Sequence, residues 1–103
     1  MEMYTQLKGS EAILVVSGRV TAEDASALKD RLMAELTANS HCLVMDLSRV
    51  DFMGSAGLGS LITGVKEAKA HGGDLVLAAP SSVVMTLLNV SGLLTFVSHR
   101  PSL

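Results

Sequence analysis

The sequence of 103 residues contains no tryptophan, one tyrosine and two phenylalanines, although hydrophobic residues make up 49% of it. The core therefore has to be built from aliphatic side chains, which suits helices packed on a sheet. The longest purely apolar runs, Ala12–Val16 and Leu75–Ala79, are far shorter than a membrane span. The N-terminus has neither the basic nor the apolar part of a signal peptide. We expect one domain over residues 1–103 that is soluble and cytoplasmic and does not insert into a membrane.

The sequence has only one cysteine and no strong excess of acidic or basic residues. The single cysteine, Cys42, cannot form an internal disulfide, and its place at the head of the apolar run CLVMDL predicts a buried thiol. The net charge is −2, with acidic and basic residues interspersed. This pattern argues against direct binding of nucleic acid or an anionic membrane. A partner would have to be recognised by local shape and local charge.

Apolar periodicity predicts strands that alternate with helices. After an initial hairpin, the units are short enough that only right-handed crossovers fit, so we expect an α/β (mixed α+β) fold, a mixed sheet with helices mainly on one face. The predicted strands are Met3–Lys8 at an edge, Ala12–Ser17 buried on both faces, Cys42–Leu47, Asp74–Ala79 and Leu94–Val97. The predicted helices run from the N-cap Thr21 to Asn39, from Ser55 to Ala70, and from Ser81 to Val90.

The segment Leu43–Ile62, LVMDLSRVDFMGSAGLGSLI, places a lone serine where a buried strand, a glycine turn and a helix start meet. That serine, Ser55, lies among the unpaired backbone N–H groups at the positive end of the helix dipole. A phosphate added to its hydroxyl would meet a favourable field. Ser55 is therefore a candidate phosphorylation site.

The helix that begins at Ser55 has small, uncharged side chains on one side of its first two turns. Helical spacing sets these residues opposite the apolar stripe that contains Leu58 and Val65, and so predicts that they face solvent. A smooth surface of this kind lets the backbone of another protein approach closely, and a charge at its rim would change which partner binds. The residues of this predicted docking face are Ala56, Gly59, Ser60 and Thr63.

Catalytic readings of the glycine turn fail on spacing. A phosphate-binding P-loop needs a lysine where Ser60 stands, and a nucleophile elbow needs a glycine where Met53 stands. Asp46 is expected to accept hydrogen bonds from the loop that follows it, which we favour over an acid–base or Mg²⁺-binding role with Asp51. The three histidines are not neighbours on one helix face, so we expect solvated surface histidines. We predict no catalytic residue, no metal and no cofactor.

Four segments together resemble the STAS domain, and within it the bacterial anti-sigma factor antagonists. The strand and loop LVMDLSRVDFMGSAGLGSL resemble the family signature, an apolar strand ending in Asp-Leu, then an apolar pair before Asp-Ser-Ser-Gly-Leu-Gly. The other segments, similar to the first-helix entry, the next strand and the closing helix and strand, are GRVTAEDASALKDRL, HGGDLVLAA and VMTLLNVSGLLTFV. The resemblance runs over almost the full length and implies the STAS fold.

The resemblance also implies a function. In that family the serine after the signature Asp is phosphorylated by an anti-sigma factor that is also a serine/threonine kinase, and a PP2C-type phosphatase reverses the change. The matching residue here is Ser55. The resemblance thus implies a non-enzymatic module in a partner-switching pathway. The expected partner-binding residues are Thr21, Gly54, Ser55, Ala56, Gly59, Ser60 and Thr63.

Three residues depart from the family pattern. Gly54 replaces the signature Asp, Thr21 replaces an Asp usual at the start of the first helix, and Ala56 replaces the second signature Ser. These changes reduce the local negative charge that a kinase would read. They leave open an alternative, a STAS scaffold or accessory subunit of a signalling complex or a lipid-transport ATPase, in which Ser55 is only an N-cap. A small enzyme or nucleotide binder is the weakest alternative.

Overall fold

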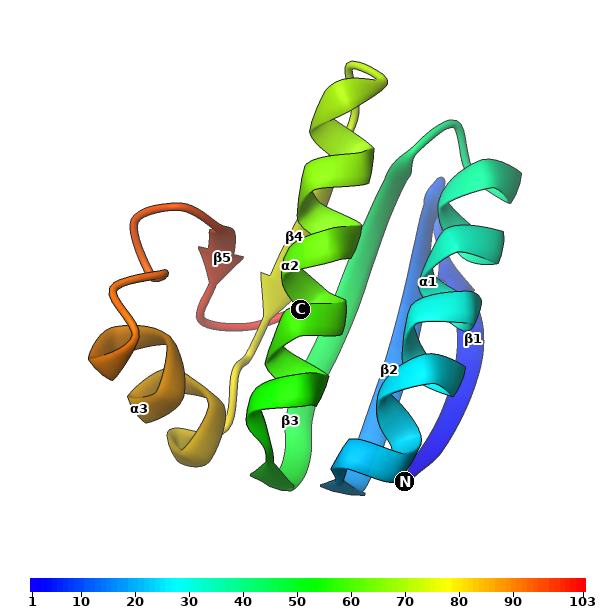
Figure 1. The fold of residues 1–103 in the computed structure, drawn as a ribbon. Helices are drawn as coiled ribbons and strands as arrows, with labels where there is room; N and C mark the ends of the chain where they lie inside the picture. The colour runs from blue at the N-terminus through cyan, green and yellow to red at the C-terminus, as the bar shows by residue number, and fades with distance from the viewer.

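Five strands form one mixed sheet in the order β1-β2-β3-β4-β5 in the computed structural model, which describes residues 1–103 (Figure 1). Strand β1 pairs antiparallel with β2, and the remaining neighbours pair in parallel. The strands are β1 (Glu2–Lys8), β2 (Glu11–Val20), β3 (Cys42–Met53), β4 (Asp74–Ala78) and β5 (Ser98–Arg100). The helices are the 3₁₀ turn η1 (Ala22–Asp24), α1 (Ala25–Ala38), α2 (Ser55–Ala70) and α3 (Ser82–Val90). The α/β class is confirmed.

The main core lies between the sheet and the helices, with α1 and α2 side by side on one face (Figure 1). Helix α1 buries Leu28, Leu32 and Leu36, which recur at the four-residue spacing that keeps a stripe on one side of a helix. Helix α3 adds Val84 and Leu88 to the same core. No helix combines the length and the apolar character that crossing a membrane requires.

A second, smaller cluster lies on the other face of the sheet. It contains Ile13 and Val15 of β2, Val44 of β3 and Ala78 of β4. Strand β2 is therefore buried on both faces, as its continuous apolar run predicts. A salt bridge links β5 to β2, because Nη2 of Arg100 lies 2.9 Å from Oε1 of Glu11.

Strands β2 and β3 continue past their predicted ends, to Val20 and Met53. The pairing shifts register on either side of Ser17–Gly18, and Gly18 has a φ of +87°, a conformation that glycine adopts without strain. The apolar run predicts only the fully buried part of each strand. The extension matters because it brings Val20 beside Met53, directly before the two segments that start η1 and α2.

Two sequence predictions about local structure are wrong. The last strand is Ser98–Arg100, whereas Leu94–Val97 forms turns in which the N–H groups of Phe96 and Val97 both donate to the carbonyl of Leu93. Val97 is part of the main core and Leu94 packs against it, although neither belongs to a strand. Cys42 is exposed. As the first residue of β3 it alternates with Leu43 and so lies on the face away from the helices, at the rim of the sheet.

Candidate functional site

The parallel strands β2 and β3 end side by side, and the chain enters a helix after each of them (Figure 1). Val20 and Met53 are register partners, and the N–H of Gly54 donates to the carbonyl of Val20 at 3.0 Å. Thr21 and Ser55 are the residues that open η1 and α2 at this edge. The fold thus brings together the two segments in which the sequence departs from the family pattern.

Ser55 is exposed and is the first residue of α2, so its interpretation as the N-cap is wrong, because Gly54 holds that position. The first hydrogen bond of the helix runs from the N–H of Leu58 to the carbonyl of Gly54 at 3.1 Å, so the N–H groups before it have no partner within the helix. No side chain caps this end, and its first turn holds no acidic residue. By contrast, Ser81 caps α3 by accepting a hydrogen bond from the N–H of Val84. The N-terminus of α2 is therefore a positive helix end that is open to an anion.

Gly54, the N-cap of α2, has a φ of −82° and a ψ of 171°, an extended conformation open to any residue. A Cβ there would lie 3.8 Å from Cε2 of Phe52 and 3.9 Å from the carbonyl oxygen of Val20, which is ordinary contact. The backbone therefore does not require glycine. An aspartate, which the family signature has at this position, would fit.

Thr21 directs its polar groups at Asp24. Both its N–H and its Oγ1 donate to Oδ2 of Asp24, each at 2.9 Å. These two bonds, the backbone one first, hold the pKa of the Asp24 carboxyl below its ordinary value. Thr21 is the predicted N-cap. Of the two helices that start at this edge, η1 therefore has a carboxylate in its first turn and α2 has no acidic residue there.

The predicted docking face of α2 is exposed at three of its four residues. Ala56, Gly59 and Thr63 all lie at the surface. A Cβ added at Gly59 would meet nothing within 4 Å. The Oγ1 of Thr63 donates to the carbonyl of Gly59 at 3.0 Å, so this hydroxyl is turned back onto its own helix. The exposed face is smooth and carries no charge.

Ser60 does not face solvent, and this prediction is wrong. Its side chain is buried, and its Oγ donates to the carbonyl of Ala25 at 2.7 Å, across to α1. Ser60 lies one turn from both Gly57 and Gly64, on the side of α2 that packs against α1. The apolar stripe identifies the side that faces the sheet, but it does not reveal that a second helix covers the flank beside it.

Sequence reasoning missed a pair of residues next to Ser55. Arg19 and Phe52 are register partners on β2 and β3, and the Arg19 guanidinium carbon lies 4.4 Å from the centre of the Phe52 ring. Phe52 is 37% exposed. An exposed aromatic under an arginine is a common component of protein interfaces. The available signal was a rare aromatic placed two residues before the glycine turn.

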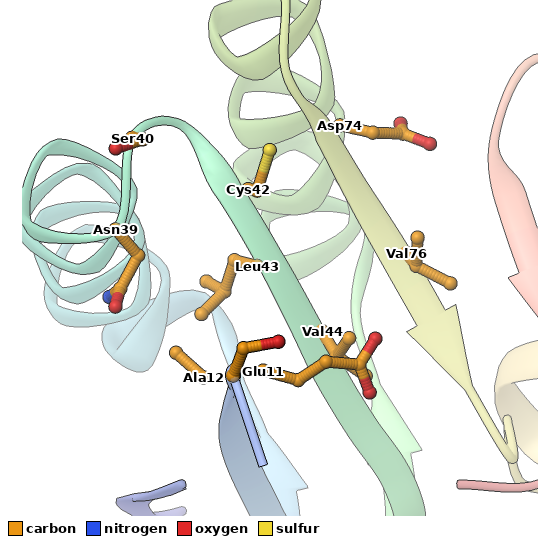
Figure 2. A pocket seen from close by; sticks show the side chains of 10 residues that line it. Glu11, Ala12, Asn39, Ser40, Cys42, Leu43, Val44, Asp74 and Val76 are labelled. Carbon is orange, nitrogen blue, oxygen red and sulfur yellow. The ribbon is translucent and has the colours of Figure 1, made fainter. Parts of the chain in front are cut away.

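The hollow in the surface lies elsewhere. Figure 2 shows it at the start of β2, β3 and β4, where Glu11, Cys42 and Asp74 are among its lining residues. Ser55 follows the opposite end of β3, so this hollow is not part of the site. Asp46 is taken up by the chain itself, because the N–H and Oγ of Ser48 donate to its Oδ1 at 3.0 and 2.7 Å. The predicted acceptor role of Asp46 is confirmed, but the donor Ser48 belongs to β3 and not to a loop.

Comparison with known proteins decides the family. The family model described as "Mlab, STAS domain" matches residues 3–98. This chain belongs to the STAS-domain family. The BtrV protein of Bordetella bronchiseptica, assigned as an anti-sigma factor antagonist, is 30% identical over 83 residues, which cover 81% of this STAS chain and 72% of BtrV.

Two solved structures share the fold of this domain. An anti-sigma factor antagonist from Mycobacterium paratuberculosis has a TM-score of 0.86 and 24% identity, over 99% of this STAS domain and 86% of that chain. The phosphorylated form of the Bacillus cell fate determinant SpoIIAA has a TM-score of 0.73 and 16% identity, over 96% and 91% of the two chains. By sequence and fold the STAS domain groups with the anti-sigma factor antagonists.

Proposed function

We propose that residues 1–103 form one cytoplasmic STAS domain that acts as an anti-sigma factor antagonist and is switched by phosphorylation of Ser55. In its unmodified form it binds an anti-sigma factor that is also a serine kinase. A phosphate on Ser55 breaks that complex, and a PP2C-type phosphatase restores it. The protein has no catalytic role of its own in this scheme.

The observation that carries the proposal is the uncapped N-terminus of α2 with an exposed hydroxyl at its first residue. Unpaired N–H groups and the helix dipole stabilise an anion there by about 0.3–1 kcal/mol at an exposed site. A phosphate on Ser55 would be stabilised at this helix end, and no acidic side chain in the first turn of α2 would repel it. A phosphorylated form exists for SpoIIAA, which shares this fold.

Gly59 supports a docking role for the face beside Ser55. Glycine in the interior of a helix costs about 1 kcal/mol relative to alanine. Nothing in this chain lies within 4 Å of where its Cβ would be, so internal packing does not account for it. Close approach of a partner backbone does account for it. Ala56 and Thr63 are exposed on the same side of α2.

The phosphorylation is tested by incubating the protein and ATP with purified anti-sigma factors of the kinase type from its own organism and measuring intact mass. We expect one added phosphate, lost in Ser55→Ala. The matched control is Ser82→Ala, because Ser82 is an exposed serine at the first residue of α3. Equal phosphorylation of the wild type and Ser55→Ala would contradict the proposal.

Docking is tested with Ala56→Arg, which should abolish binding to the anti-sigma factor and leave the unfolding curve unchanged. Ala70→Arg is the control, since Ala70 is exposed on the same helix but at its other end. If both variants bind as the wild type does, the surface around Ala56 is not the docking face.

A second candidate function follows from the absence of acid at the start of α2. In a scaffold or an accessory subunit of a signalling complex or a lipid-transport ATPase, Ser55 would stay unmodified and the same face would bind a constant partner. The matching family model, described as "Mlab, STAS domain", does not by its name point to an anti-sigma factor antagonist, and so is compatible with this second function. Unphosphorylated protein purified with a transporter subunit, and lost from it by Ala56→Arg, would favour this second function.

A further inference from the structure

Two histidines that are far apart in the sequence meet at the C-terminal end of α2. His41 follows α1, and His71 is the C-cap of α2. Their rings are stacked, with centroids 4.0 Å apart and planes inclined by only 6°. Glu67, one helical turn before His71, places its Oε1 3.5 Å from the Nδ1 of His71. The fold therefore assembles two imidazoles and a carboxylate that the sequence predicts as separate surface groups.

The backbone holds His41 in place. Its φ of +61° lies in the left-handed region, which costs a non-glycine residue about 1–3 kcal/mol. The N–H of Asp74 donates to the His41 carbonyl at 3.0 Å. A Cβ on Gly73 would lie 2.0 Å from that carbonyl oxygen, so only glycine allows the two loops to approach this closely. The backbones of the loop before β3 and the loop before β4 are thus held against each other, with one histidine on each loop.

His71 is oriented by its own helix. Its Nδ1 lies 3.0 Å from the carbonyl oxygen of Glu67, within hydrogen-bond distance. In the tautomer that donates a proton to this carbonyl, the Nε2 keeps its lone pair. A backbone carbonyl that fixes one ring nitrogen in this way is a common feature of metal-binding histidines.

The donor atoms are close enough to share one ion. One ligand atom from each of His41, Glu67 and His71 lies within 4.8 Å of the other two. Nitrogen and oxygen bind Zn²⁺ at about 2.0–2.2 Å, so two ligand atoms of a tetrahedral ion are about 3.3–3.6 Å apart. Rotation of the His41 and Glu67 side chains closes this gap and moves the His41 ring out of the stack, while Nδ1 of His71 keeps its contact with the carbonyl of Glu67.

We propose that His41, Glu67 and His71 form a Zn²⁺ site. Two imidazoles and one carboxylate are a donor set that zinc favours, and the fourth position of the tetrahedron stays open to water or another ligand. The C-terminal end of a helix also favours a cation. A bound ion would join the loop before β3 to the end of α2.

This site is independent of the proposed switch. It lies at the opposite end of α2 from Ser55, and a helix of 16 residues is about 24 Å long. Loss of zinc binding and loss of partner binding can therefore be separated by experiment.

The test is a zinc titration of the full chain against a chromophoric chelator, with thermal unfolding followed in parallel. We expect the wild type to bind a single zinc ion and to unfold at a higher temperature when zinc is present, because a ligand that binds only the folded state stabilises it. The variants His41→Asn, His71→Ala and Glu67→Gln should each weaken binding by about tenfold or more. Asparagine is chosen at position 41 because it tolerates a positive φ.

Two variants serve as controls. His99→Ala removes the remaining histidine, which is exposed on β5, and Cys42→Ser removes the exposed thiol next to His41. Both should bind zinc as the wild type does. The site is refuted if His71→Ala and His41→Asn, shown to be folded by circular dichroism, bind zinc as tightly as the wild type, or if only Cys42→Ser loses it.

Discussion

The two sides of α2 carry the same kinds of small residue for different reasons. On the side toward α1 and the sheet, a Cβ at Gly57 would lie 2.7 Å from Cγ1 of Val20, and one at Gly64 would lie 3.0 Å from Cδ2 of Leu75. On the outer side, a Cβ at Gly59 would touch nothing. The inner side is small because the fold is tight there. The outer side is small without any cause inside this chain, which makes it the better candidate for a binding surface.

The sharpest test of this comparison is to add one methyl group on each side. Gly57→Ala forces the Cβ against the buried Val20, and overpacking of this kind costs about 1–3 kcal/mol. Gly59→Ala should instead stabilise the fold by about 1 kcal/mol, the difference in helix propensity. Urea denaturation of the two variants should give shifts of opposite sign. Shifts of the same sign would remove the distinction between the two sides.

Two of the three hydroxyl side chains of α2, one on each side of the helix, provide a smaller test. Ser60→Ala should cost about 1 kcal/mol, because its buried Oγ bonds to the carbonyl of Ala25 on α1. Thr63→Ala should change the free energy of unfolding by no more than about 0.5 kcal/mol, since that side chain is exposed and bonds only to its own helix. If Thr63→Ala proves the more damaging in chemical denaturation, the outer side has a structural role that its contacts do not explain.

A substitution at the N-cap of α2 should change the free energy of unfolding by a still smaller amount. Gly54→Asp should stabilise the protein by a few tenths of a kcal/mol, because aspartate caps a helix slightly better than glycine and its Cβ fits there. The same variant should be phosphorylated faster at Ser55 if a kinase reads the flanking acid that the family signature contains. Thermal unfolding gives the first value and a timed mass measurement the second. A destabilised Gly54→Asp would mean that the turn needs glycine after all.

The smallest expected effect concerns the helix start that does carry an acid. Bonds from Thr21 lower the pKa of Asp24, so the folded state favours its carboxylate. Its contribution is present at neutral pH and is lost as the pH falls below about 4, where the unfolded chain takes up the proton first. Asp24→Asn should flatten the acid limb of the stability curve slightly. An unchanged limb, measured by thermal unfolding from pH 6 down to about 3, would contradict this assignment.

The acid limb will not vanish in that variant, because Glu35 contributes in the same range. Burial raises the pKa of Glu35, but the hydroxyl of Thr5 and the guanidinium of Arg31 outweigh burial and lower it. These three side chains link the edge strand β1 to α1. Glu35→Gln in combination with Asp24→Asn should flatten the limb further than either change alone.

The bounds of α2 could be predicted from the sequence because its signals are local. A glycine precedes Ser55, an apolar stripe recurs at helical spacing, and His71 begins a glycine-rich stop, so the helix was expected over Ser55–Ala70 and was found there. Thr21 and Asp46 were also predictable, since each bonds within three residues of itself. Local hydrogen bonds follow from residue type and spacing alone.

What could not be predicted depends on which element lies beside which. The helical periodicity of α2 predicts Ser60 at the surface, because periodicity alone does not show that α1 packs against this side of the helix. The exposed Cys42 followed from its position at the sheet's rim, and Leu94–Val97 turned out to pack as turns because the last strand pairs only through Ser98–Arg100. In each case the apolar run or helical face is present as predicted, but the prediction of what packs against it is wrong.

The sequence by itself determined the order of strands and helices, the aliphatic core and the placement of Ser55 at a helix start, because these follow from periodicity, capping and turn residues over a few positions. The tertiary structure alone decided which small residues are packed and which are free, set Arg19 over Phe52, and brought His41 against His71. Contacts between segments far apart in the chain depend on sheet register and helix packing, which no local pattern encodes.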